Sequence, residues 1–250
     1  MVTLDLIGIG TGNPDHVTLE AIRVMRRADL ILLPRKGDAK ADLADLRRQI
    51  CAVHLDDLSP ITEFDLPTRD SRADYLGAVN DWHDAIARAW LDTIDTRLPT
   101  GGRVALLVWG DPSLYDSTLR IAERLGRTRA LTTRVVPGVT SLSVLTAAHG
   151  VPLNDLGAPV VITTGRQLRE TGWPAGTMAV AVMLDAGGAF MAVPQDGVHI
   201  WWGAYLGMAH QALIQGPLAE VADRIIQTRA ELRERHGWIM DIYLLKRGDG

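Results

Sequence analysis

GIGTGNPDHVTLEA, residues 8–21, overlaps the end of the apolar run Val2–Ile9. Its three glycines at alternate positions allow a tight backbone turn at the end of a predicted strand. Thr18 is suited to cap the helix that follows, and Val17 and Ile22 have the spacing of a hydrophobic staple. Strand, turn and helix together form the first unit of an α/β fold.

The turn is similar to the glycine-rich loop that binds a dinucleotide, but it departs from that loop at one position. The dinucleotide loop has glycine at its sixth position, where this sequence has Asn13 followed by Pro14. A nicotinamide-dependent oxidoreductase also needs an acidic residue at the end of the second strand, and this sequence has Pro34, Arg35 and Lys36 there. Two classes of protein therefore stay open as alternatives for this loop: the nicotinamide-dependent oxidoreductase and a cofactor-binding module without catalytic activity.

The composition is that of an ordinary globular protein of 250 residues, with 47% hydrophobic and 22% charged residues. Its apolar runs are too short to span a bilayer and its N-terminal stretch lacks a basic region, so we expect a cytoplasmic protein without a membrane partner. A net charge of −4 argues against a general nucleic-acid surface.

The numbers and spacing of cysteines and histidines limit which disulfides and metal sites the sequence can form. The single Cys51 excludes an internal disulfide and a cysteine metal cluster, and we expect it to be a small buried thiol. No two of the seven histidines have the close spacing of paired metal ligands on one helix, so no metal site is predicted.

Apolar segments alternate with helical patterns over the first 150 residues, which predicts a mostly parallel, doubly wound sheet. After the first strand, strands are predicted over residues 28–34, 103–109 and 133–136, with a weak one near 52–55. Helices are predicted over residues 39–51, 75–98 and 140–149, and the stretch 56–74 is predicted to be a loop.

Residues 151–159 break both periodicities through their proline, asparagine and glycine, so we expect a domain boundary there. The predicted domains are residues 1–153, an α/β domain with the glycine-rich loops, and residues 154–250, a mixed α/β domain. Strands in the second domain are predicted over residues 159–164, 177–184, 199–204 and 238–246, with a helix over 218–235. Strands separated less regularly by helices favour a mixed sheet with an antiparallel edge.

Three glycine-containing turns follow predicted strands of the first domain: residues 8–14, 110–116 and 137–143. In an open parallel sheet, such turns leave the carboxyl edge, where ligands bind. We therefore predict one ligand site formed by all three turns.

The turns contain three motifs in this order: GIGTGNPDHVTLEA, GDPSLYD and VPGVTSLS. Their order resembles that of the tetrapyrrole methylase family of S-adenosylmethionine-dependent enzymes, and the resemblance covers the whole chain. The resemblance implies two α/β domains with the active site in the cleft between them, and a homodimer. Segments 33–51, 201–207 and 236–247 are similar to the branch that methylates C1 of precorrin-5 and releases acetate, giving precorrin-6A and S-adenosylhomocysteine. A sister methylase acting on another precorrin, or on another acceptor such as RNA, is the alternative within the family.

The resemblance also implies which residues bind the methyl donor. Carried over onto this sequence, they are Pro14, Trp109, Gly110, Asp111, Pro112, Tyr115, Thr140, Ser141, Met183, Leu184, Gly203 and Ala204. Leu184 stands where many members have glycine, and Trp109 where members often have another glycine, so Trp109 is expected to narrow the pocket wall. The donor-binding candidates also have a purely structural interpretation. Gly110–Pro112 can form a simple turn, and Thr140 and Ser141 can cap a helix.

An acceptor rich in acetate and propionate groups needs local cations, because the protein as a whole is acidic. Carboxylate clamps are therefore expected at Arg35, Lys36, Arg166, Lys40 and Arg169, with solvated surface charge as the alternative, more so for the last two. Gly10 and Gly12 are expected to let the backbone approach the macrocycle.

Loss of the acetyl group requires a base that activates water for attack on the acetyl carbonyl. The sequence offers only candidates for it: Asp111, Asp38 and Asp185.

Overall fold

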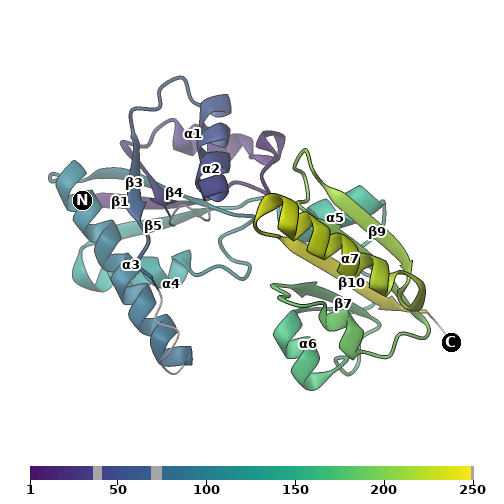
Figure 1. The fold of residues 1–250 in the computed structure, drawn as a ribbon. Helices are drawn as coiled ribbons and strands as arrows, with labels where there is room; N and C mark the ends of the chain where they lie inside the picture. Colours follow the sequence, from purple (N-terminus) through teal and green to yellow (C-terminus); the bar gives the residue numbers. More distant parts are fainter. Residues whose placement is uncertain (36–40, 69–74, 249–250) are drawn as a thin grey trace. The chain divides into compact units, whose positions relative to one another are not determined.

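The structure is a computed structural model that describes residues 1–35, 41–68 and 75–248 (Figure 1). Its contacts divide the chain into two units, Met1–Thr140 and Ser141–Gly250. This division lies earlier than the boundary predicted after residue 153, because helix α5 (Ser141–His149) packs on strands of the second unit. The predicted fold class, α/β with one parallel and one mixed sheet, is confirmed.

The first unit contains a five-stranded sheet in the order β3-β2-β4-β1-β5, and all neighbouring strands in it are parallel. The strands are β1 (Val2–Gly8), β2 (Leu30–Arg35), β3 (Ile61–Asp65), β4 (Gly102–Val108) and β5 (Leu131–Val136). Because β1 pairs with both β4 and β5, the loops that follow these three strands leave the sheet side by side.

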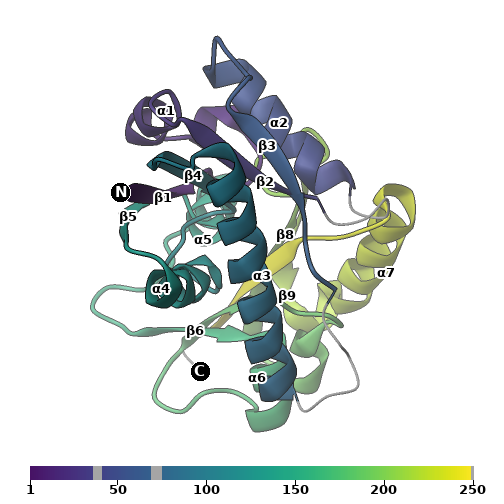
Figure 2. The same cartoon turned by 90° about the vertical axis from the view of Figure 1, so that its left-hand side faces the viewer.

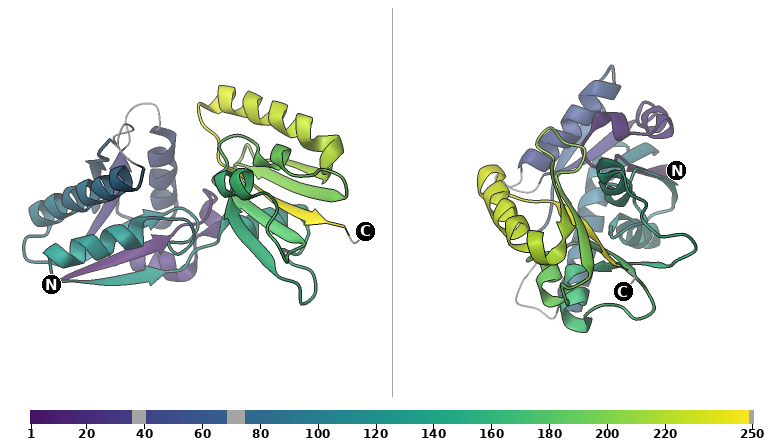
Figure 3. Two further views of the ribbon diagram at one scale, coloured as in Figure 1. Left: turned by 90° about the horizontal axis from the view of Figure 1, so that it is seen from below. Right: turned by 90° about the vertical axis from the view of Figure 1, so that its right-hand side faces the viewer.

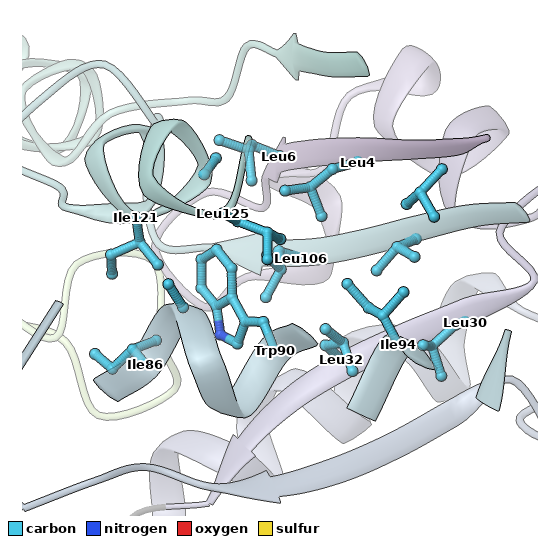
Figure 4. Close-up of a cluster of buried hydrophobic side chains, with 14 of the residues drawn as sticks. Leu4, Leu6, Leu30, Leu32, Ile86, Trp90, Ile94, Leu106, Ile121 and Leu125 are labelled. Atoms are coloured by element: carbon cyan, nitrogen blue, oxygen red, sulfur yellow. The ribbon is translucent and has the colours of Figure 1, made fainter. Parts of the chain in front are cut away.

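Helices cover both faces of this sheet, as alternation of side chains along buried strands requires. They are α1 (Leu19–Met25), α2 (Ala41–His54), α3 (Tyr75–Arg97) and α4 (Thr118–Thr128). Figure 2 looks onto α3, which lies in front of the strands. The core on the side of α3 and α4 includes Leu4, Leu6, Leu32, Ile86, Trp90, Ile94, Leu106, Ile121 and Leu125 (Figure 4).

The opposite face packs against α1 and α2. Ile7 and Ile9 of the first strand region lie there with Met25 of α1 and Cys51 of α2. Cys51 is fully buried, as predicted, and burial raises the pKa of its thiol to about 11. The predicted cap of α1 is also confirmed, since Thr18 Oγ1 accepts a hydrogen bond of 3.1 Å from the backbone N–H of Ala21.

Two predictions for the first unit are wrong. Residues 52–54 complete helix α2, so no strand forms there, and strand β3 lies instead at Ile61–Asp65, inside the predicted loop. β3 is a short edge strand whose residues are mostly half-exposed. Such a strand lacks the apolar run or clean alternation that identifies buried strands in a sequence.

The second unit contains a mixed five-stranded sheet in the order β6-β7-β10-β8-β9, in which only β6 and β7 pair in parallel. Its elements are β6 (Val160–Thr164), α6 (Gly165–Thr171), β7 (Ala179–Met183), β8 (Val198–Ala204), β9 (Ala212–Pro217), α7 (Leu218–His236) and β10 (Asp241–Arg247). α7 runs along this sheet against β8 and β9 (Figure 3). The sequence patterns missed α6 and β9.

Among the residues that the structure describes, no helix combines the length and the apolar character that crossing a membrane demands.

Trp202 of β8 is fully buried, whereas its neighbour Trp201 is half-buried, in keeping with the alternation expected for a strand. The prediction of an active site between the two domains stays a prediction.

Candidate functional site

Three glycines, one from each predicted loop, meet backbone to backbone at the carboxyl edge of the parallel sheet. A Cβ atom on Gly8 would lie 2.6 Å from Cα of Gly138 and 2.7 Å from the carbonyl oxygen of Gly110, and a Cβ on Gly138 would overlap that same oxygen. No larger side chain fits at these positions. We call Gly8, Gly110 and Gly138 the glycine junction; it confirms that the three loops lie together.

The first loop, residues 9–16, and the donor loop, residues 109–116, are also joined by a short antiparallel bridge. The N–H of Gly110 donates to the carbonyl of Gly10 at 2.7 Å, and the N–H of Gly10 donates back at 3.4 Å. Both residues have positive φ, 73° for Gly10 and 62° for Gly110, and Gly12 has a φ of 110°. A Cβ on Gly110 would lie 3.9 Å from Cα of Thr140, so the loop after β5 adjoins the bridge.

Asp111 links the donor loop to the loop after β5. Its Oδ1 accepts hydrogen bonds from the N–H and the hydroxyl of Ser113, and its Oδ2 accepts one of 2.9 Å from the N–H of Gly138. Burial alone would raise the pKa of Asp111, but these hydrogen bonds outweigh it and lower the pKa below its ordinary value. The carboxylate therefore stays charged and positions two loops of the site.

Backbone strain occurs in or beside the segments that are predicted to bind the donor. Among the described residues, the non-glycine residues with positive φ are Tyr115 (49°), Leu184 (52°) and Tyr205 (49°). Each lies within or directly beside a predicted segment, and such left-handed residues cost about 1–3 kcal/mol and gather at functional sites. The side chains of Tyr115 and Leu184 are exposed, whereas Tyr205 is buried.

The remaining donor-binding candidates lie in or next to these segments. Pro14 begins a short 3-10 helix, and its carbonyl accepts a hydrogen bond of 3.0 Å from Nε2 of His54. Pro112 is buried, and Ser141 is the first residue of α5. In the second unit, Met183 ends β7, and Gly203 and Ala204 end β8 just before Tyr205.

Arg47 of α2 is a charged group near the donor loop that sequence reasoning missed. Its Nε donates a hydrogen bond of 3.1 Å to the carbonyl of Leu107, and its guanidinium lies 5.1 Å from the ring centroid of Trp109. Burial lowers the pKa of Arg47 to about 10, while the charge of Asp116 opposes this shift. Arg47 is thus a cation at neutral pH that supports Trp109, and only its place in a predicted helix was visible in the sequence.

The proposed carboxylate clamps have different surroundings. Arg35 ends β2 and forms a two-pronged ion pair with Asp65 of β3, at 2.7 and 3.1 Å, on the exposed edge of the sheet. Arg166 of α6 is also exposed and lies 4.0 Å from Glu170. Arg169 instead pairs with the buried Asp185 at 2.7 Å. Lys36, Lys40 and Asp38 lie outside the described residues.

Asp185 follows β7 and has four donors around its carboxylate. They are the backbone N–H groups of Gly187 and Ala189, the guanidinium of Arg169 and the hydroxyl of Tyr243. Burial raises its pKa, but the hydrogen bonds outweigh burial and the net pKa is lowered. This arrangement holds the segment after β7 in place and makes the carboxylate a weak proton acceptor.

The sequence is also similar to proteins that are already known. The sequence matches the family described as Tetrapyrrole (Corrin/Porphyrin) Methylases over residues 3–222. It is 47% identical over 247 residues to "Precorrin-6A synthase [deacetylating]" of a Sinorhizobium species, covering 97% of this chain and 94% of that relative.

Solved structures resemble the whole chain. A crystal structure of a cobalamin synthesis related protein (CobF) from Corynebacterium diphtheriae has a TM-score of 0.86 and 41% identity, with 100% of each chain covered. Uroporphyrin-III C-methyl transferase from Thermus thermophilus, crystallised with S-adenosyl homocysteine, has a TM-score of 0.62 at 18% identity, covering 98% of this chain and 92% of that one, and shares the fold. The chain therefore belongs to the tetrapyrrole (corrin/porphyrin) methylase family.

Proposed function

We propose that the protein methylates C1 of precorrin-5 with S-adenosylmethionine and releases acetate, so that precorrin-6A and S-adenosylhomocysteine are formed. The observation that carries the proposal is the 47% identity to a deacetylating precorrin-6A synthase over nearly the full length of both chains. The junction of three loops at the carboxyl edge of a parallel sheet supports it, since ligands bind there in open α/β sheets.

The methyl donor is expected to bind over the donor loop. Its positive sulfonium makes the methyl group electrophilic, so the protein has to hold this methyl in line with the carbon nucleophile and away from water. Gly138 lets the loop after β5 pack against the main chain of Gly110, and Asp111 fixes the two loops against each other. Tyr115, Thr140 and Ser141 are expected to contact the donor from the same loops.

The macrocycle is expected to present its carboxylates to cations. Arg35 and Arg166 are exposed and are the described candidates for this role. Arg169 is assigned to the support of Asp185 instead, because it pairs with that buried carboxylate. The proposal also includes a cytoplasmic location, a homodimer and a reaction that needs no metal. Measurement of the molecular mass in solution tests the homodimer, and activity after treatment with a chelator tests the independence from metal.

The direct test is incubation of the purified protein with methyl-labelled S-adenosylmethionine and precorrin-5. We expect a methylated product together with acetate in equal amounts, both detected by mass spectrometry. Methylation of precorrin-5 without acetate would contradict the deacetylating reaction and favour a sister methylase. Failure to methylate precorrin-5, with methylation of another precorrin, would reassign the acceptor, and binding of the donor without any transfer would favour a cofactor-binding module.

A further inference from the structure

His16 is held at the carboxyl edge of the parallel sheet by the first loop. It ends the short 3-10 helix Pro14–His16, which α2 supports through the hydrogen bond from His54 to Pro14. A Cβ on Gly10 would lie only 2.8 Å from Cβ of His16, so glycine at position 10 makes room for the histidine. Gly10 in turn is bridged to Gly110, which connects His16 to the donor loop through one residue.

The hydrogen bonds around His16 determine which ring nitrogen carries the proton. Oδ1 of Asn13 accepts a bond of 2.9 Å from the N–H of Asp15, which orients the side-chain amide. The NH₂ group of Asn13 therefore faces Nε2 of His16, at 3.5 Å, as a donor. Nε2 must then be the unprotonated nitrogen, and Nδ1–H donates to Oγ1 of Thr11 at 3.4 Å.

This arrangement provides a proton acceptor with a fixed orientation. Thr11 is buried and holds the ring from the Nδ1 side, and His16 itself is half-buried. In contrast, the carboxylates of Asp111 and Asp185 are both occupied by backbone and side-chain donors, and their pKa values are lowered. Nε2 of His16 instead accepts a single long bond of 3.5 Å from a neutral amide, which a water molecule can displace more readily than the several donors held by each carboxylate.

We propose that His16 is the general base for loss of the acetyl group, an assignment that rests on the proposed function. Nε2 takes one proton from a water molecule while the water oxygen bonds to the acetyl carbonyl carbon. The bond between that carbon and C1 then breaks, acetic acid leaves, and the released electron pair on C1 bonds to the methyl carbon of the donor. The sulfonium becomes the neutral thioether of S-adenosylhomocysteine, and the proton on His16 passes to solvent.

Asn13 and Thr11 act as positioning residues in this scheme. The Thr11 oxygen accepts the Nδ1–H bond and thereby stabilises the ring in one tautomer. The Asn13 amide fixes the position of Nε2, and its N–H groups are donors beside the point where charge develops on the carbonyl oxygen.

The test compares His16→Ala with the wild type under single-turnover conditions, with precorrin-5 and labelled S-adenosylmethionine. We expect acetate and methylated product to fall together by about a hundredfold. Affinity for S-adenosylhomocysteine, measured by calorimetry, should stay within about twofold. Free imidazole added to His16→Ala should restore a substantial part of the acetate rate. His54→Ala is the matched control, because it removes a histidine that supports the same loop, and imidazole should not restore its rate.

The outcomes separate the proposal from the function on which it rests. Wild-type protein that yields no acetate from precorrin-5 overturns both. Wild-type acetate formation that persists within about threefold in His16→Ala overturns the role of His16 and leaves the function intact. A loss of acetate that imidazole does not restore, or that imidazole restores equally in His54→Ala, assigns His16 to loop structure and also overturns the proposal.

Discussion

Asp111 and Gly138 are joined by a single hydrogen bond of 2.9 Å, from the backbone N–H of Gly138 to the carboxylate of Asp111. The other oxygen of the same carboxylate accepts a hydrogen bond from the N–H of Ser113, so both oxygens of Asp111 must be acceptors. Asp111→Asn would place an NH₂ group against one of these two N–H donors. We expect affinity for S-adenosylhomocysteine to fall about tenfold, or about 1.4 kcal/mol, measured by calorimetry.

Asp57→Asn is the control for this prediction. Asp57 lies between α2 and β3, outside the candidate site, and its carboxylate accepts from the N–H and the hydroxyl of Ser59, which are both local donors. Its affinity for S-adenosylhomocysteine should stay within about twofold of the wild type. Equal losses of affinity in the two variants would show that the hydrogen bond between the two loops does not determine binding of S-adenosylhomocysteine.

Gly138→Ala should be far more damaging than an ordinary glycine substitution. A Cβ at this position overlaps the carbonyl oxygen of Gly110, so the loops have to separate. We expect the free energy of unfolding, from urea titration, to fall by about 3 kcal/mol or more. Gly126→Ala in α4 is the matched change: nothing lies within 4 Å of its Cβ, and removal of a helical glycine should stabilise by about 0.5–1 kcal/mol. Similar effects of the two substitutions would contradict the crowding at the glycine junction.

Asp185→Asn tests the buried carboxylate of the second unit. Removing the charge leaves Arg169 and two backbone N–H groups poorly paired, which should lower the free energy of unfolding by about 3 kcal/mol at pH 7. Because the folded-state pKa of Asp185 is depressed, its stabilisation is present above the unfolded-state pKa and is lost as pH falls through the folded-state value. The wild type should therefore lose stability below about pH 4 more steeply than the variant.

Thermal or urea unfolding between pH 2 and pH 7 provides the measurement, with Asp196→Asn, at an exposed position, as the control. That control should follow the wild-type curve. If Asp185→Asn is as stable as the wild type at pH 7, the carboxylate has no structural role, and Asp185 returns as a candidate base.

Arg35→Ala and Arg166→Ala should each weaken precorrin binding by about tenfold while affinity for S-adenosylhomocysteine is retained, because their predicted partner is the macrocycle's carboxylates. Arg127→Ala is the control, since Arg127 is an exposed residue of α4 paired with Glu123. Calorimetric titration with each ligand checks the prediction. If both ligands lose affinity equally, or neither does, Arg35 and Arg166 are not specific clamps.

The parts of the fold that follow from local pattern could be predicted. Buried parallel strands such as β2 and β4 contain apolar runs of four or five residues, and glycines after strands identify the loops of the candidate site. β3 could not be predicted, because an edge strand of five residues leaves no strong pattern. The contact of Arg47 with Leu107 joins positions 60 residues apart, so neither residue indicates the other in the sequence.

The carboxylates show a second limit of sequence reasoning. Asp111 and Asp185 both follow strands, and in the sequence both qualify as bases. Gly138, a donor to Asp111, and Tyr243, a donor to Asp185, come from distant parts of the chain, and only the folded structure reveals that they occupy the oxygens. His16, by contrast, is paired within its own loop, and the spacing of Thr11, Asn13 and His16 is a local signal that could have been used.

The glycine junction has a consequence for how this family can diversify. A side chain at Gly8 or Gly138 would collide with the main chain of the other loops, and one at Gly110 would have to adopt a positive φ. Residues further along the loops, such as Tyr115, are not part of this main-chain contact. New acceptor specificities are thus expected to arise by substitution at the loop tips, while the glycine junction is inherited unchanged.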